Sequence, residues 1–149
     1  MSRQNAQEIA ERSAAAMWKG DEAARLVGAS LESVGPGTAV TSLIIGAQHL
    51  NGHNICHGGV IFTLADVAFA CACNSYNQIA VAQQNSISYL TPGKLGERLI
   101  ATAKETQKVG RTGVYDVTVT GDEGKIVAEF RGCSRIIRGQ HYYEDEGKS

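Results

Sequence analysis

Residues 57–74 read HGGVIFTLADVAFACACN, a run with the length of one long helix. Two glycines open it after a polar loop, and from Val60 to Cys73 the run is apolar on all sides except at Thr63 and Asp66. A helix that is apolar all round is typical of one that is buried on every side. The run therefore predicts a buried helix around which the rest of the chain is arranged.

Asp66 is the residue that does not suit a buried helix. The positions one turn away on either side (62, 63, 69 and 70) hold no lysine or arginine that could pair with its carboxylate. Burying an unpaired carboxylate costs several kcal/mol, in rough terms. Either the fold supplies a polar cavity for Asp66, or the residue is neutral, and both cases make it a candidate functional residue.

The composition indicates one globular domain. The chain has 149 residues, which is enough for a full hydrophobic core, and its net charge of −1 points to neither a nucleic-acid groove nor an anionic membrane surface. The amino-terminal residues precede no apolar segment of a secretion signal, and no apolar run approaches the ~18 residues of a membrane span. Four cysteines without a C-x-x-C pair suggest buried, reduced thiols. We expect a soluble, unexported, cytoplasmic protein.

The pattern of the remaining residues predicts an antiparallel sheet. No helix separates the later strands, so parallel crossovers are excluded and one sheet wrapped around the central helix is the economical arrangement. The expected fold class is α+β, with an amino-terminal helical part at 1–22, one domain at 23–138 and a polar tail at 139–149. The predicted elements are a helix at 5–19, strands at 26–34 and 38–45, the central helix, and strands at 79–90, 98–109, 112–120 and 126–137.

The third predicted strand carries the polar run QQNS at residues 83–86, in its middle. At least one face of this strand should therefore meet a polar cavity or another subunit. A single sheet with one helix on one face also leaves its other face and its edges in need of cover. We expect a homo-oligomer that is at least a dimer, and we favour a dimer of dimers.

Several motifs together resemble the hotdog-fold acyl-CoA thioesterases, in particular those of phenylacetate degradation. The similarity covers nearly the whole chain except the first ~20 residues and the tail. It implies a hotdog fold, with a curled antiparallel sheet around the long helix and active sites at the junction of two subunits. The motifs that carry it are LNGH (50–53), CHGG (56–59), FxLADxAFA (62–70), YLTPG (89–93), TGVYD (112–116) and FRG (130–132).

The resemblance also implies roles for individual residues. Asp66 corresponds to the catalytic carboxylate, and Gly58 to the residue whose backbone N–H polarises the thioester carbonyl. Where some relatives carry a serine that orients the attacking water, this chain has Ala82, so Gln83 or Asn85 nearby are candidates for that role. The loop residues that shape the site are Asn51 and His57, and the residues expected to bind substrate are Gly59, Phe62, Gln83, Asn85 and Arg111.

Thioester hydrolysis needs positive potential at the carbonyl oxygen and a base or nucleophile at the carbonyl carbon. The unpaired N–H groups at the start of a helix supply the first, and a glycine there allows close approach of the substrate. Asp66 supplies the second, either by accepting a proton from water or by attacking to give a mixed anhydride. Gly58 and Asp66 lie eight residues apart, roughly 12 Å at ~1.5 Å per residue, too far to reach one carbonyl group. Each site should therefore combine Gly58 of one subunit with Asp66 of another.

Other interpretations compete at the level of single residues. His49, His53, Cys56 and His57 have donor atoms for zinc, but they occupy one loop with a single thiol, so we expect neither a metal nor another cofactor. Asp66 could be a purely structural carboxylate. The cations Lys104, Lys108 and Arg111 are either a solvated face or a site for the phosphates of coenzyme A.

Three classes of function remain open for the whole chain. The first is a thioesterase acting on phenylacetyl-CoA and its ring-hydroxylated forms, with the aryl group against Phe62, Phe69 or the third strand. Hydroxybenzoyl or medium-chain acyl-CoA would suit an apolar pocket equally well. The second class is a hotdog hydratase or dehydratase, and the third is a non-enzymatic acyl-CoA binding module.

Overall fold

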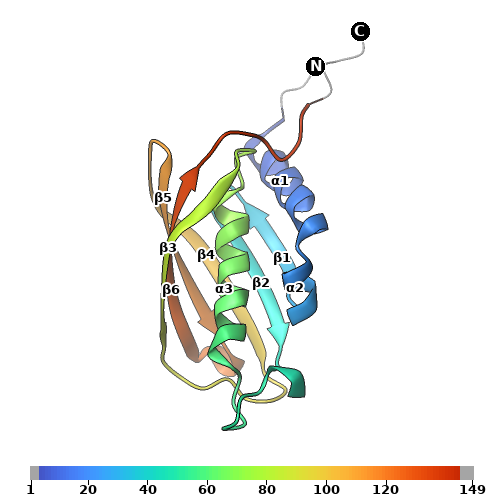
Figure 1. The fold of residues 1–149 in the computed structure, drawn as a ribbon, viewed down its shortest axis with the longest axis vertical. Helices are drawn as coiled ribbons and strands as arrows, with labels where there is room; N and C mark the ends of the chain where they lie inside the picture. Colours follow the sequence, from blue (N-terminus) through green and yellow to red (C-terminus); the bar gives the residue numbers. More distant parts are fainter. Residues whose placement is uncertain (1–3, 145–149) are drawn as a thin grey trace.

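The run at 57–74 forms helix α3 (Gly58–Cys73), which lies along the concave face of one curled sheet in the computed structural model (Figure 1). The structure describes residues 4–144. Residues 1–3 and 145–149, and with them the end of the predicted tail, lie outside the described residues. The predicted fold class, a long helix wrapped by an antiparallel sheet, is confirmed.

The sheet has six strands, all antiparallel, in the order β1-β2-β4-β5-β6-β3. In this order β1 and β3, the two strands that directly follow α-helices or their loops, lie at the two edges of the sheet. The long predicted strands agree with the structure to within about one residue at each end. The bounds are β1 Ser30–Gly35, β2 Thr38–Ile44, β3 Ala80–Tyr89, β4 Arg98–Val109, β5 Thr112–Thr120 and β6 Ile126–Ile136.

One predicted strand begins too early. The strand is expected to start at Leu26, but Leu26 and Val27 form the end of a short helix, α2 (Glu22–Val27). Strand β1 starts only at Ser30. The Asp21 carboxylate caps this helix by accepting from the N–H of Ala24 at 3.0 Å, and Gly28 ends it in the left-handed region at φ 81°. These are standard helix start and stop signals, and they outweigh the short apolar run.

The two edges of the sheet differ in how they are covered. Helix α1 (Ala6–Gly20) lies beside β1, and the Gln7 side chain donates to the carbonyl of Val34 at 2.8 Å. Strand β3 pairs only with β6 among residues 4–144, and it is largely exposed, with Val81 at 43% and Tyr89 at 50%. The open edge of the sheet is thus the strand that carries the polar run QQNS.

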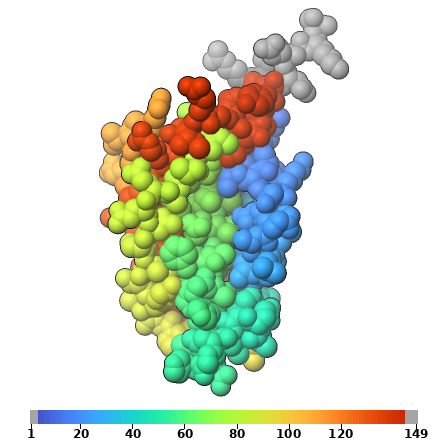
Figure 2. Space-filling view, in the orientation of Figure 1, coloured from blue at the N-terminus to red at the C-terminus, as the bar shows by residue number. Residues whose placement is uncertain are grey.

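The sequence predicts that helix α3 is buried on every side, and this prediction is wrong. One stripe is only partly covered and includes Gly59, Phe62, Thr63, Asp66 and Ala70. Figure 2 shows green α3 atoms at the surface between the yellow-green β3 and the blue amino-terminal helices. The sheet curls around the opposite face, so nothing within residues 4–144 closes this stripe. The buried residues of α3 are Ile61, Leu64, Ala65, Val67, Ala68, Phe69, Cys71, Ala72 and Cys73.

The core lies between α3 and the sheet. Phe69 packs edge-on against Tyr115 with ring centroids 5.6 Å apart, and both side chains are fully buried. Three of the four cysteines, Cys56, Cys71 and Cys73, are buried free thiols, as the sequence predicts. Among the described residues, no helix has the length and apolar character needed to cross a membrane.

Candidate active site

The amino-terminal end of α3 presents one backbone N–H without an acceptor. His57 caps the helix, and its Nδ1 accepts from the N–H of Gly59 at 3.1 Å. Among the hydrogen bonds within residues 4–144, none uses the N–H of Gly58. The cap therefore satisfies the second N–H of the helix and leaves the first open, at the positive end of the helix dipole. The role that the resemblance implies for Gly58, polarising the thioester carbonyl, stays a prediction, and this open N–H is the donor that the role requires.

Gly58 also lies against a tyrosine. The Tyr89 hydroxyl, at the end of β3, donates to the carbonyl oxygen of Gly58 at 2.8 Å. A Cβ atom at position 58 would lie 3.0 Å from Cζ of Tyr89 and 3.1 Å from its Oη, closer than ordinary contact. A side chain at this position would thus displace Tyr89 as well as obstruct access to the free N–H.

The loop before α3 and the end of β3 enclose a small cavity beside Gly58. Asn51 shapes this loop, because its Oδ1 accepts from the N–H groups of His53 at 2.9 Å and Ile55 at 3.3 Å. The cavity has a volume of about 280 Å³, and most of its side chains are apolar. Its lining comprises Asn51, Ile55, Cys56, Gly58, Ile61, Tyr89, Leu90, Thr91 and Pro92.

Asp66 lies two turns further along α3, on the partly covered stripe. Its Oδ1 accepts from Nδ2 of Asn85 on β3 at 3.3 Å. Burial raises the pKa of the Asp66 carboxyl, the hydrogen bond from Asn85 lowers it, and the Asp21 carboxylate raises it, with a net increase above the ordinary value. A carboxyl with a raised pKa is a stronger base than one in water, as general-base chemistry requires.

The Asn85 side chain has an unused hydrogen-bond acceptor. Its Oδ1 is buried and accepts no hydrogen bond within residues 4–144, although its Nδ2 donates to Asp66. A buried amide oxygen without a partner is unfavourable by about 1–3 kcal/mol and indicates that a donor comes from elsewhere. The candidate Asn85 is thus brought to Asp66, whereas the other candidate, Gln83, is exposed at the β3 bulge.

The residues predicted to form one site lie in two groups within the chain. Gly58, Asn51 and His57 cluster at the start of α3, whereas Asp66 and Asn85 meet eight residues further on. One helix spans both groups, so they are separated by roughly 12 Å along its axis. The structure of one chain therefore does not assemble Gly58 and Asp66 around one substrate carbonyl.

The aromatic candidates differ in access. Phe62 lies on the open stripe, is half-buried and packs edge-on against Phe130 at 5.4 Å between ring centroids. Phe69 is 1% exposed within the core. Of the three alternatives for the aryl contact, Phe69 is therefore excluded, because Tyr115 and Phe130 pack against its buried ring.

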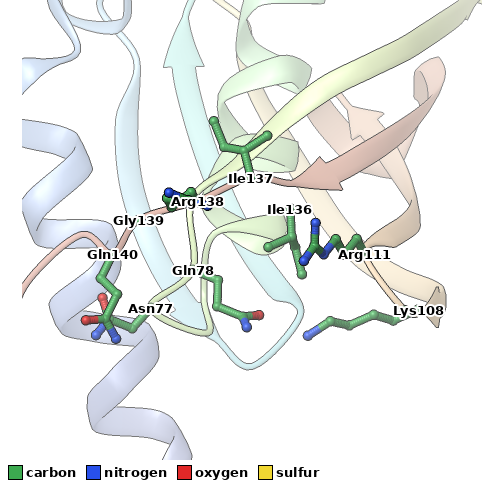
Figure 3. Close-up of a pocket in the computed structure, with 10 residues that line it drawn as sticks. Asn77, Gln78, Lys108, Arg111, Ile136, Ile137, Arg138, Gly139 and Gln140 are labelled. Atoms are coloured by element: carbon green, nitrogen blue, oxygen red, sulfur yellow. The ribbon is translucent and has the colours of Figure 1, made fainter.

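The predicted cation group and the loop considered for zinc both lie away from Asp66. Arg111 is at the tip of the β4–β5 hairpin, in a second cleft with Lys108 (Figure 3), whereas Lys104 lies outside that cleft on β4. In the loop proposed as an alternative zinc site, His49 Nδ1 accepts from the N–H of Gly46 at 2.9 Å and Nε2 bonds the carbonyl of Val27 at 2.7 Å. Within residues 4–144, no cluster of three metal-ligating side chains is found.

Tyr89 is the residue of this region that sequence reasoning missed. It belongs to the YLTPG motif, but nothing in its spacing indicates that its hydroxyl reaches the carbonyl of Gly58, 31 residues earlier. The antiparallel arrangement of α3 and β3 produces this contact. Only a pairing of strand and helix in space could have revealed it.

Comparison with known proteins gives consistent matches. A sequence model of the thioesterase superfamily matches residues 53–128. The acyl-coenzyme A thioesterase PaaI of Escherichia coli is 45% identical over 128 residues, covering 86% of this chain and 91% of that protein.

Solved structures agree with the sequence matches. The E. coli PaaI protein, described as coming from the phenylacetic acid degradation operon, is similar with a TM-score of 0.89 and 43% identity, covering 91% of this chain and 99% of that one. A hypothetical thioesterase of Streptococcus pneumoniae, solved with coenzyme A, has a TM-score of 0.71 and 29% identity, covering 76% of this chain and 88% of that one.

Proposed function

The chain belongs to the thioesterase superfamily and is a PaaI-like acyl-CoA thioesterase, and on this premise we propose that it hydrolyses arylacetyl-CoA thioesters. The proposed substrates are phenylacetyl-CoA and hydroxyphenylacetyl-CoA, which yield the free acid and coenzyme A. Support for the aryl group comes from the E. coli relative, which is described as a protein from the phenylacetic acid degradation operon. We also propose a cytoplasmic location, consistent with the buried free thiols.

The observation that carries the mechanism is the pairing of two features on one helix. The N–H of Gly58 has no acceptor within the described chain, and the Asp66 carboxyl has a raised pKa and one hydrogen-bonding side chain, Asn85. In the proposed reaction the Gly58 N–H donates to the thioester oxygen as it gains negative charge. Asp66 either removes a proton from the attacking water or attacks the carbonyl carbon itself, giving an anhydride that water then hydrolyses. In both routes the thiolate of coenzyme A leaves and takes up a proton.

The acyl group has a fitting place beside Gly58. A thioester whose oxygen lies at the Gly58 N–H would direct its acyl group into the 280 Å³ cavity under Asn51 and Tyr89. The side chains of Ile55, Ile61 and Leu90 give that cavity an apolar lining suited to a planar ring. We propose that this cavity, together with the exposed side of Phe62, holds the aryl ring.

The separation of Gly58 from Asp66 favours a site shared by two subunits. Strand β3 offers an unpaired edge, and the partly covered stripe of α3 lies beside it. Two copies that join their β3 edges in antiparallel fashion would continue the sheet and cover the stripe. We propose a homodimer built in this way, which associates further into a dimer of dimers.

Two side-chain contacts within the chain support one register for such a pairing. Tyr89 lies level with Gly58 and Asn85 lies level with Asp66, because each pair is hydrogen-bonded. An antiparallel pairing centred on Ile87 sets Asn85 opposite the Tyr89 of the second copy. Asp66 of each copy would then lie level with the Gly58 of the other.

The substrate proposal is tested by a thiol-trapping assay with phenylacetyl-CoA, hydroxybenzoyl-CoA and octanoyl-CoA. We expect kcat/KM to be at least about tenfold higher for the arylacetyl thioester, because a compact ring in the small apolar cavity loses less conformational freedom than an eight-carbon chain. Equal values for octanoyl-CoA and phenylacetyl-CoA would overturn the aryl preference while leaving the thioesterase activity intact.

The shared site is tested by mixing subunits. Asp66→Asn chains refolded together with Asn51→Ala chains should form hybrid dimers in which one of two sites has both groups intact. With equal amounts of each chain, about a quarter of wild-type activity is expected from random pairing. Failure to recover activity from two well-folded variants, or light scattering that shows an active monomer, would contradict the shared site.

A further inference from the structure

Tyr89 lines the candidate site, but no step of the proposed mechanism uses its hydroxyl. That hydroxyl donates to the carbonyl oxygen of Gly58 at 2.8 Å. Burial raises the pKa of the Tyr89 hydroxyl, so it remains a protonated donor at neutral pH. Tyr89 is 50% exposed and lies outside the hydrophobic core, so packing of the core does not account for this contact.

The peptide group that joins Gly58 to Gly59 is held at both ends. Its carbonyl oxygen, which belongs to Gly58, accepts from the Tyr89 hydroxyl. Its N–H, which belongs to Gly59, donates to Nδ1 of His57 at 3.1 Å. Because a peptide group is planar, hydrogen bonds at its two ends restrict its rotation. These bonds supply a restraint that the two flanking glycines, which have no side chains, do not give.

The preceding peptide group carries the open N–H of Gly58. Its carbonyl oxygen, which belongs to His57, accepts from the N–H groups of Val60 at 3.0 Å and Ile61 at 3.3 Å. The two successive peptide groups thus have four hydrogen-bonding groups, and within residues 4–144 three of them are bonded. The direction of the fourth, the N–H of Gly58, is set by the bonds of the other three.

Tyr89 is fixed in place through its own backbone. It pairs with Ala128 in the register of β3 with β6, and the next residue, Leu90, donates its N–H to the carbonyl of Val127 at 2.8 Å. The Tyr89 ring lies against Gly58, where a Cβ atom would be 3.0 Å from its Cζ. A phenol that projects from a paired strand holds its partner more precisely than one on a loop.

We propose that Tyr89 is a positioning residue of the thioesterase reaction, which aims the N–H of Gly58 at the thioester oxygen by holding the carbonyl of the same residue. The proposal rests on the proposed thioesterase function and extends it from the donor to the side chain that orients it. A donor that is already aimed where charge develops needs no reorganisation as the transition state forms. In this role Tyr89 acts through Gly58 and does not touch the reacting carbonyl.

The first test is Tyr89→Phe, which keeps the ring and removes only the hydroxyl. Loss of a whole oxyanion donor costs about 10²–10³ in kcat, so a donor that is present but less well aimed should cost about tenfold. KM for phenylacetyl-CoA should stay within about twofold of the wild type, because the ring still lines the cavity. The acidic limb of the kcat–pH profile, which Asp66 sets, should not move.

The matched control is Tyr142→Phe, which removes a hydroxyl that donates to Gln4 at 2.9 Å, outside the candidate site. Rates are measured below the thermal midpoint of each variant, so that unfolding does not imitate a loss of kcat. Four results would overturn the proposal. They are an unchanged kcat in Tyr89→Phe, a fall in kcat/KM that comes from KM alone, a shift of the acidic limb, and an equal loss of kcat in Tyr142→Phe.

Subunit mixing assigns Tyr89 to one half of the shared site. Tyr89 serves the Gly58 of its own chain, so Tyr89→Phe chains should regain activity with Asp66→Asn chains but not with Asn51→Ala chains. Random pairing gives about a quarter of wild-type activity in the first mixture and about a twentieth in the second. Recovery with Asn51→Ala instead would overturn the proposal, because Tyr89 would then act on the Asp66 of its own chain. If Asp66→Asn and Asn51→Ala chains fail to complement each other, the shared site is refuted and the kcat of Tyr89→Phe alone decides.

Hydrogen exchange separates this proposal from the proposed function. The N–H of Gly59 belongs to the peptide group that Tyr89 holds. Its exchange, followed by NMR, should quicken about fivefold in Tyr89→Phe, which corresponds to the net loss of one ordinary hydrogen bond, and should not change in Tyr142→Phe. Faster exchange would support the positioning role even in a protein that cleaves no thioester, a result that would refute the proposed function alone. Equal exchange in wild type and Tyr89→Phe would overturn the positioning role.

Discussion

The region around Asp66 and the region around Glu97 each hold a carboxyl group away from solvent, with opposite consequences. Glu97, 7% exposed, accepts from Lys125 and from the N–H groups of Lys94 at 2.9 Å and Asp122 at 3.0 Å. Burial raises its pKa, but the Lys125 hydrogen bond and the two N–H donors outweigh burial, and the net pKa is lowered. Asp66 has one amide donor, and its net pKa is raised. A carboxylate with a full set of donors stabilises the fold, whereas one with too few is available for chemistry.

The largest expected effect follows from removing the charge at Asp66. Asp66→Asn keeps the shape and removes the base or nucleophile, so kcat should fall by about 10² or more while KM changes little. The thermal midpoint should equal or exceed that of the wild type, because a poorly compensated carboxylate is lost. Steady-state kinetics and thermal unfolding check both statements. Turnover that persists in Asp66→Asn would refute the mechanism.

The same substitution at Glu97 should do the reverse. Glu97→Gln leaves Lys125 without its partner and weakens two N–H contacts, so the free energy of unfolding should drop by about 2–3 kcal/mol. Because Glu97 lies outside the candidate site, kcat of the folded protein should remain within about twofold of the wild type. Chemical denaturation and the thiol-trapping assay measure the two quantities. A Glu97→Gln variant that keeps wild-type stability but has low activity would contradict this difference between the two regions.

The two regions should also respond to pH with opposite signs. A carboxyl whose pKa is lowered by folding contributes stability above its unfolded value, and this contribution is lost as pH falls through the folded value. The stability deficit of Glu97→Gln should therefore be largest near pH 7 and shrink toward acid pH. A carboxyl whose pKa is raised costs stability once pH exceeds its ordinary value of 3.8. The stability gain of Asp66→Asn should likewise be present near pH 7 and vanish below about pH 4. Unfolding measured from about pH 2 to about pH 8 covers the titration of both carboxyl groups. Curves of the same sign would contradict the pKa directions.

The smallest expected effect concerns the one donor that Asp66 has. Asn85→Ala removes the hydrogen bond that lowers the pKa of Asp66, so that pKa should rise further. The acidic limb of the kcat–pH profile should shift upward, with only a few-fold loss of kcat at its plateau. Ser88→Ala, an exposed residue of the same strand, is the matched control. A uniform loss of kcat without a shift of the limb would mean that Asn85 does not act through Asp66.

The sequence by itself determined most of the fold. The apolar run of α3 and the regular strand patterns predicted the wrapped helix and the bounds of the long strands, because hydrophobic periodicity is a local property. Local signals were also sufficient to place Gly58 at a helix start and to mark Asp66 as out of place. The one misplaced strand start, at Leu26, reflects local signals too, since Asp21 and Gly28 were available as caps.

Tertiary structure alone decided how these pieces meet. The contact of Tyr89 with Gly58 and that of Asn85 with Asp66 arise from the packing of β3 against α3. The second cleft, at the tip of the β4–β5 hairpin, gathers residues from three separate segments. The open stripe of α3 depends on how far the sheet curls, so a helix that is apolar all round is left partly uncovered. Such contacts join residues far apart in the chain, and their free energies depend on packing that no local pattern encodes.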